Sequence, residues 1–216
     1  MAKNTVWHDE YWLLLLQTYL LRPVGMKALY SRAMVELSLE LHITPQVLQA
    51  RMRQIDRLDT PRLERIWKTY STSPRRLARA VRLLREMKGF GAADEFYEGV
   101  EVQETFERDF RPLAEDPRLT PVMLILILNL YYQLTPSTMV AETPEVADLA
   151  RLIGLKAKDV VHVLEVFQIC DPYLEHNAVT LSPLLLPCQQ VWQRMSDKEP
   201  QDIDALAEQL KDYYRL

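Results

Sequence analysis

Arginines repeat at helical spacing between Pro74 and Lys88, and they are the side chains best suited to binding an anion. An inward stripe of a helix over this segment would be formed by Leu77, Ala80, Val81, Leu84 and Met87. Five arginines lie outside that stripe: Arg75, Arg79, Arg82 and, further round the helix, Arg76 and Arg85. Guanidinium groups along one helix face can neutralise the phosphates of a nucleic-acid backbone. The alternative is a solvated face whose charge is balanced by acidic residues of the same chain.

Few other side chains are spaced for catalysis or metal binding. The histidines are far apart and form no ligand pair at helical spacing: His8, His42, His162 and His176. Cys170 and Cys188 show neither a metal spacing nor a disulfide framework, and we interpret them as free thiols. The chain has no phosphate-binding glycine loop and no Gly-x-Ser-x-Gly elbow. We therefore expect no enzyme activity, no metal and no cofactor.

Several polar side chains are expected to be solvated rather than functional. His162 and Glu165, one helical turn apart, are typical of a surface pair. Glu101, Glu104 and Glu107 share a helical face and are interpreted as solvated charge rather than as paired catalytic carboxylates.

Prolines in this chain are expected to mark the starts of helices, or in some cases turns. Nine of the thirteen prolines follow Ser, Thr or Asp, a combination typical of a helix N-cap and first turn: Pro45, Pro61, Pro74, Pro117, Pro121, Pro136, Pro144, Pro172 and Pro183. No stretch alternates as an amphipathic strand would. The sequence therefore predicts an all-α fold.

Two stretches, Leu13–Asp59 and Ile125–Asp171, carry the same apolar pattern at an offset of 112 residues. Each predicts an apolar helix followed by two further helices, which indicates an internal duplication. The apolar helix of the second stretch, residues 121–134, is expected to be buried, with the tyrosine pair 131–132 in the core. Beyond the second stretch, a C-terminal amphipathic helix with Ile203, Leu206, Leu210 and Tyr213 is expected to pack back on the body.

The segment 146–160 resembles the helix-turn-helix superfamily. Ala150 is the small residue at the helix crossing, Gly154 lies in the turn, and Leu155 and Val160 fill the angle between the helices. The resemblance covers residues 143–170 and, less closely, residues 31–58. In the first copy Ser38, Ile43 and Leu48 fit the pattern. His42 replaces the turn glycine, and Arg51 occupies a position that is usually apolar.

This resemblance implies that the second helix of each motif would lie in a major groove of DNA. Carried over by position, the base-reading side chains of the first copy would be Gln46, Gln49, Arg53 and Arg57. Glutamine can pair with adenine and arginine with guanine. The second copy would offer Lys158, Val161, His162 and Glu165, which suit packing better than DNA.

Charge is segregated along the chain, whose formal net charge is −4. Residues 47–91 hold twelve Lys/Arg against four Asp/Glu, whereas residues 92–118 hold three against nine. We therefore divide the chain into an N-terminal helical unit with the basic helix (1–91), an acidic aromatic connector (92–120) and a C-terminal helical unit (121–216).

The whole chain also resembles an uncharacterised family of conserved bacterial proteins of the Bacteroidales type. The phrases behind the resemblance are Tyr-Trp-Leu-Leu-Leu-Leu (11–16), Phe-Tyr-Glu-Gly-Val-Glu-Val (96–102) and Cys-Asp-Pro-Tyr-Leu (170–174). It implies no activity.

Together these patterns predict a cytoplasmic regulatory protein that binds duplex DNA through residues 47–91 and packs or dimerises through its apolar C-terminal unit. The start of the chain lacks the apolar core of a signal peptide, and no apolar run is long enough to span a membrane. The alternative is a helical protein-interaction module without nucleic-acid binding, whose basic helix docks on an acidic partner or on residues 94–116. A small-molecule sensor with a pocket between the two apolar helices is a third possibility.

Overall fold

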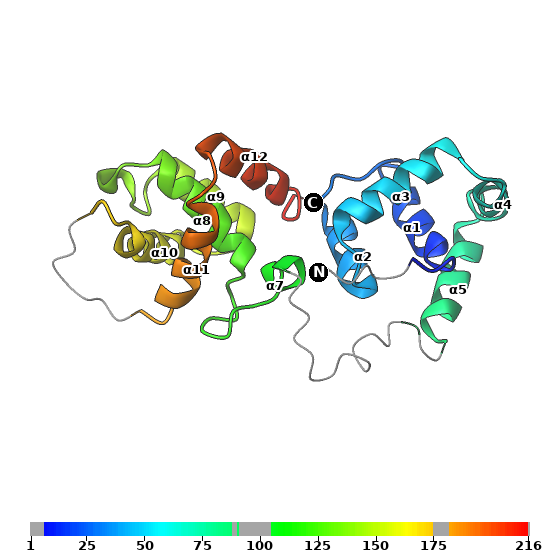
Figure 1. Cartoon of the computed structure of the whole chain (residues 1–216), viewed down its shortest axis with the longest axis horizontal. Helices are drawn as coiled ribbons and strands as arrows, with labels where there is room; N and C mark the ends of the chain where they lie inside the picture. Colours follow the sequence, from blue (N-terminus) through cyan, green and yellow to red (C-terminus); the bar gives the residue numbers. More distant parts are fainter. Residues whose placement is uncertain (1–6, 88–89, 91–104, 175–181, 216) are drawn as a thin grey trace. The chain divides into compact units, whose positions relative to one another are not determined.

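The structure, a computed structural model, describes residues 7–87, 90, 105–174 and 182–215 (Figure 1). Every regular element within these ranges is a helix, which confirms the all-α prediction. The chain divides into two compact units, residues 1–104 and 105–216. None of the helices in the described ranges is long and apolar enough to cross a bilayer.

The first unit is built around α1 (Tyr11–Leu20), which packs against the four helices that follow it. These are α2 (Arg32–Leu41), α3 (Pro45–Arg57), α4 (Pro61–Tyr70) and α5 (Pro74–Arg85). All five contribute to one apolar core, in which Leu14, Leu15 and Leu16 of α1 are buried.

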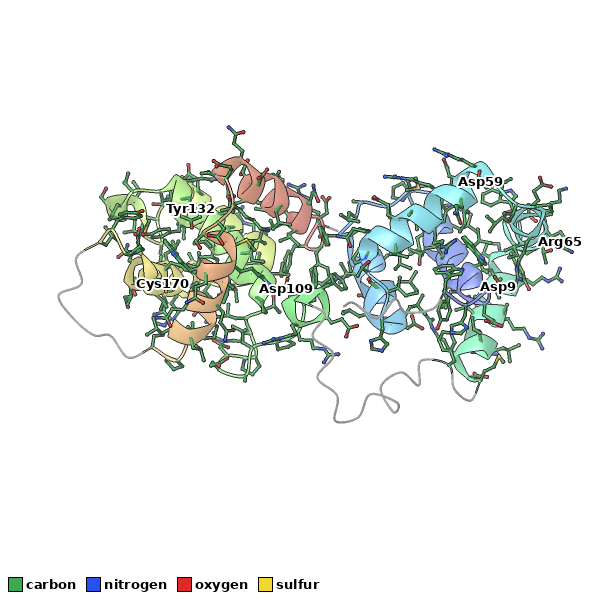
Figure 2. All side chains as sticks on the ribbon, viewed as in Figure 1. Asp9, Asp59, Arg65, Asp109, Tyr132 and Cys170 are labelled. Atoms are coloured by element: carbon green, nitrogen blue, oxygen red, sulfur yellow. The ribbon has the colours of Figure 1, made fainter. Side chains whose placement is uncertain are left out.

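The second unit is built around α8 (Pro121–Gln133), which packs against α7, α9, α10, α11 and α12. The bounds of these helices are α7 (Thr105–Asp109), α9 (Pro144–Ile153), α10 (Ala157–Cys170), α11 (Leu185–Met195) and α12 (Pro200–Lys211), with a short 3-10 helix η1 (Pro136–Thr138) after α8. The apolar side chains of α8 are buried along most of its length, as predicted. Tyr131 is buried, but Tyr132 at the end of α8 is 42% exposed, so the prediction that both tyrosines lie in the core is wrong for Tyr132 (Figure 2).

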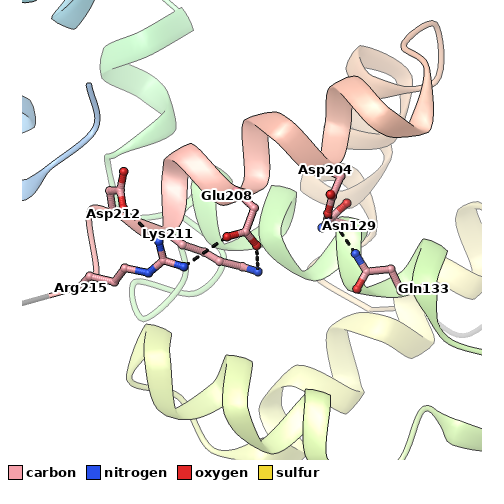
Figure 3. A network of polar contacts seen from close by, with 7 residues as sticks. All are labelled: Asn129, Gln133, Asp204, Glu208, Lys211, Asp212 and Arg215. Carbon is pink, nitrogen blue, oxygen red and sulfur yellow. Dashed lines mark hydrogen bonds and ion pairs between the residues drawn. The ribbon is translucent and has the colours of Figure 1, made fainter. Parts of the chain in front are cut away.

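The C-terminal helix α12 packs on α8 through apolar and polar contacts. Ile203 and Leu210 are buried. The amides of Asn129 and Gln133 each donate to the Asp204 carboxylate at 3.2 Å (Figure 3). Because Asn129 is buried, this bond satisfies a polar group that would otherwise be costly in the core.

Six of the nine prolines that follow Ser, Thr or Asp open a helix: those of α3, α4, α5, α8, η1 and α9. Thr60 and Thr120 also cap their helices, by accepting the backbone N–H of Leu63 and Met123. The prolines at 117, 172 and 183 lie in turns instead. A seventh proline start, Glu199-Pro200 of α12, was missed because glutamate is a poor N-cap residue.

The expected connector 92–120 contains α7, which packs on α8 in the second unit. The centroids of the Phe106 and Phe110 rings in this segment are 5.2 Å apart. The basic helix α5 ends at Arg85, so Met87, expected on its inward stripe, lies beyond the helix and is exposed.

Candidate nucleic-acid interface

The α2–α3 junction of the first unit is a tight turn. His42 ends α2 in the left-handed conformation, with φ of 53°. The Ile43 N–H donates to the Ser38 carbonyl at 3.1 Å, and the Ser38 hydroxyl donates to the Ile43 carbonyl. Ser38, Ile43 and Leu48 are all buried. A small residue at 38 therefore lets the turn fold closely against α2.

The α9–α10 junction of the second unit has the same local geometry. Gly154 ends α9 with φ of 74°, and the Leu155 N–H donates to the Ala150 carbonyl at 2.9 Å. Ala150 and Val160 are buried, and Leu155 is half-buried. The two junctions agree in the geometry of the turn alone. Glycine adopts a positive φ without steric strain, whereas His42 adopts it at a steric cost.

The candidate base-reading residues lie along the outer side of α3. Gln46, Arg53 and Arg57 are exposed, while Gln49 is half-buried. The Gln46 amide donates to the Tyr30 hydroxyl at 3.2 Å, and the Gln49 amide donates to the Lys27 carbonyl at 3.5 Å. The loop before α2 therefore occupies part of the hydrogen-bonding capacity of both glutamines.

Arg53 is hydrogen-bonded to Gln49, one turn earlier on α3. Its Nη2 donates to the Gln49 Oε1 at 3.5 Å, a long bond between groups near the surface. Arg57 has no ion-pair or hydrogen-bond partner within the described ranges. The two arginines are thus the side chains of α3 that are most available to a ligand.

Arg51, at a position that is apolar in the helix-turn-helix pattern, packs against two indole rings. Its guanidinium lies 5.2 Å from the Trp7 ring centroid and 5.9 Å from that of Trp12. Such cation–π contacts stabilise an arginine at the edge of a core. The sequence pattern could not place Trp7 there, because this tryptophan precedes the first helix.

The four candidate phosphate contacts on α5 are exposed: Arg75, Arg76, Arg79 and Arg82. Arg76 lies over the Tyr70 ring at 5.6 Å, and Arg82 pairs with Glu86 at 3.6 Å. Among the residues that the structure describes, Arg75 and Arg79 have no acidic partner. Residues 94–104, which hold five of the nine acidic residues in the segment 94–116 expected as an alternative partner, lie outside the described ranges.

Arg85 is held by the protein itself. Its Nε and Nη2 donate to the two carboxylate oxygens of Glu40 at 2.6 and 2.8 Å, and these bonds raise the pKa of Arg85. Glu40 lies on α2, one residue before its end. This bidentate pair links the last turn of α5 to the α2–α3 turn.

The eight candidates therefore form two groups on two helices. On α3, which packs on α1 and α2, Arg53 is bonded to Gln49, and Gln46 and Gln49 each bond to the loop before α2. The arginines of α5 lie on a helix that packs on α1 and α4. The ion pair between Arg85 and Glu40 connects α5 to α2.

The corresponding helix of the second unit, α10, carries no basic row. His162 and Glu165 are both exposed, with 3.8 Å between Nδ1 and Oε2, as expected for a surface pair. Asp159 instead pairs with Arg118 at 3.6 Å, beside a small cavity in this unit. That cavity is lined by Asp116, Arg118, Leu119, Leu155, Asp159, His162, Val163 and Leu184.

No group of three or more metal-ligating side chains occurs within the described part of the chain. Glu107, expected to be solvated, is buried and accepts a bond from Arg111 at 3.2 Å. That prediction failed because α7 packs on α8, a contact that sequence spacing does not reveal. His176, Glu101 and Glu104 lie outside the described residues.

No protein-family model, curated protein or solved structure matches this chain. The resemblances to the helix-turn-helix superfamily and to a Bacteroidales-type family therefore stay predictions. Any function must be argued from the surface of the protein itself.

Proposed function

We propose that the first unit binds duplex nucleic acid as part of a regulatory, non-catalytic protein. The observation that carries the proposal is the exposed arginine row of α5, in which Arg75 and Arg79 have no acidic partner among the described residues. Unneutralised guanidinium groups in a row at helical spacing suit the regular charge of a phosphate backbone.

The two helices would have different roles. On α3, Arg53 and Arg57 would contact guanine edges, while Gln46 and Gln49 would contact adenine or hold the arginines in place. On α5, Arg75, Arg76, Arg79 and Arg82 would contact phosphates and fix the position of the protein on the duplex. Phosphate contacts supply affinity without sequence preference, and base contacts supply the preference.

The first experiment is fluorescence anisotropy with a labelled duplex of random sequence, titrated at low and at physiological salt. Four phosphate contacts would give log K a slope of about −3.6 against log salt. Steeply salt-dependent binding would support the proposal. Absence of binding even at low salt would overturn it and would favour neutralisation of the arginines within the protein.

A charge-reversal variant tests which surface is responsible. Arg53→Glu with Arg79→Glu should abolish binding, because it places negative charge on both helices. The matched control is Arg151→Glu with Arg215→Glu, two exposed arginines of the second unit that produce the same change in net charge. Equal loss in both variants would mean that net charge alone governs binding and would reject the proposed surface.

The alternative, a protein-interaction module, is favoured by a different observation. Large apolar side chains are exposed in the second unit: Tyr132, Val140, Tyr173 and Leu186. Any of these side chains that lie together would provide an apolar surface for association. Light scattering across a range of protein concentrations would reveal a homodimer, and Leu186→Ser should weaken it. A monomer at every concentration would exclude self-association.

A further inference from the structure

The loop that leads from α1 to α2 (Figure 1) exposes its apolar side chains to solvent. Leu21, Val24 and Met26 are 48%, 61% and 39% exposed, and Pro23 is exposed as well. These four are all the apolar side chains of residues 21–26. Single exposed apolar side chains are ordinary on a protein surface, but four of them within six residues indicate a surface that contacts a partner.

Hydrogen bonds within the loop hold it in one shape. The Lys27 ammonium donates to the Leu21 carbonyl at 2.6 Å and also to the Pro23 carbonyl. The Gly25 N–H donates to the Tyr19 carbonyl at 3.0 Å, and Gly25 has a φ of 125°, which glycine adopts readily. The exposed side chains are therefore presented on a closed loop, which has less conformational entropy to lose when a partner binds.

The same loop is bonded to the candidate base-reading helix. The Lys27 carbonyl accepts the Gln49 amide at 3.5 Å, and the Tyr30 hydroxyl accepts the Gln46 amide at 3.2 Å. Both glutamines lie in the first two turns of α3. The loop therefore flanks the N-terminal half of α3, the part of a major-groove helix that contacts base edges.

The charge of the loop favours an anionic partner. Arg22 and Lys27 are its two charged residues, and no Asp or Glu occurs between Tyr11 and Val35. The Lys27 ammonium is turned onto the loop carbonyls, whereas Arg22 is exposed and has no acidic partner in the part of the chain that the structure describes. A basic loop with apolar side chains matches a duplex, whose phosphates lie outside a stack of apolar base faces.

We propose that residues 21–27 enter the minor groove of the duplex that α3 contacts, with Arg22 in the groove and Val24 and Met26 wedged against a base step. This inference rests on the proposed function, nucleic-acid binding by the first unit. Apolar side chains inserted between base pairs unstack them and kink the duplex by about 20–90°. TA steps deform easily, and A·T pairs lack the amino group that guanine places in the minor groove, so the loop should prefer a TA step.

The test uses the full chain and a short duplex with a central TA step and a dye at each end. Energy transfer between the dyes should rise on binding, because a kink brings the ends closer, and it should rise less for a duplex with a G·C centre. Val24→Ser with Met26→Ser should abolish the rise and weaken binding by about tenfold. The salt dependence should not change, because apolar groups release no counterions, whereas Arg22→Gln should make the slope of log K against log salt shallower by about 0.9.

The matched control is Val140→Ser with Tyr173→Ser, two exposed side chains of the second unit, which should bind and bend the duplex like the wild type. Binding without a change in energy transfer, or equal bending by the loop variant, would overturn this inference and leave the proposed function standing. Absence of duplex binding by the wild type would overturn both. Loss of binding to vesicles of anionic lipid in the loop variant, with duplex bending unchanged, would assign the loop to a membrane surface instead.

Discussion

Two tyrosines, one in the central helix of each unit, hold the end of another helix through a carboxylate. The Tyr19 hydroxyl of α1 donates to Asp56 of α3 at 2.5 Å, and the Tyr131 hydroxyl of α8 donates to Asp171, just after α10, at 2.7 Å. Tyr19 and Tyr131 are also an identical pair at the 112-residue offset. Hydrogen bonds to a charged acceptor are stronger than neutral ones, so each bond should contribute to the stability of its unit.

Replacing Tyr131 by phenylalanine should destabilise the second unit. Tyr131→Phe removes the bond to Asp171 but keeps the ring in the core, and the expected loss is about 1.5 kcal/mol in the free energy of unfolding. Urea denaturation would measure it. Tyr132→Phe is the control, because Tyr132 is exposed and donates no hydrogen bond within the described ranges; its stability should change by less than about 0.5 kcal/mol. Equal losses in the two variants would contradict a specific role for the Tyr131 bond.

Alkaline pH should weaken the first unit through Tyr19. The hydrogen bond to Asp56, burial and the charge of Asp56 raise the pKa of Tyr19 from 10.0 to about 12. The folded state thus keeps a proton that the unfolded state releases above pH 10. The stability that Tyr19 contributes is complete below pH 10 and is lost as the pH rises to about 12. Denaturation from pH 8 to 12 should show wild type and Tyr19→Phe converging above pH 10. Parallel curves would contradict the assignment.

At the scale of single elements, the helices follow from local chemistry, because a short polar side chain before proline favours the start of a helix. The exceptions depend on tertiary packing. Glu107 is buried where α7 packs on α8, and Arg51 is held against the rings of Trp7 and Trp12. The candidate site was predicted as a set of outward side chains. The hydrogen bonds of these side chains, such as that from Gln49 to the Lys27 carbonyl, depend on the path of the loop before α2. That path could not be predicted from the sequence.

The α9–α10 turn offers a direct test of backbone conformation. A Cβ added at Gly154 would meet no heavy atom within 4 Å, so Gly154→Ala should cost only the strain of a positive φ, about 1 kcal/mol in the free energy of unfolding. Asparagine tolerates this conformation better, and Gly154→Asn should therefore cost less. Thermal unfolding would rank the two variants. A larger loss for asparagine would mean that side-chain contacts, rather than φ, limit this position.

At the scale of the whole molecule, the two units differ more in charge than in local architecture. Each has a central apolar helix and a tight helix–helix turn. Residues 1–90 hold sixteen Lys/Arg against eight Asp/Glu, whereas residues 105–216 hold ten against seventeen. Net charge governs nonspecific attraction to nucleic acid, so the acidic second unit should oppose the basic first unit in any encounter with DNA.

Removing the second unit should therefore strengthen the binding of duplex DNA by the first unit. Because residues 7–85 contain a complete apolar core, a fragment of residues 1–90 should unfold cooperatively in urea. It should then bind a random duplex more tightly than the full chain at low salt. The difference should shrink toward physiological salt, where the Debye length is about 8 Å and distant acidic charges are screened. The fragment 105–216 should not bind and serves as the control.

If the folded fragment 1–90 binds no duplex at low salt, the basic face is not a nucleic-acid surface. If its advantage persists at high salt, residues beyond 90 cover that face directly rather than acting through long-range charge.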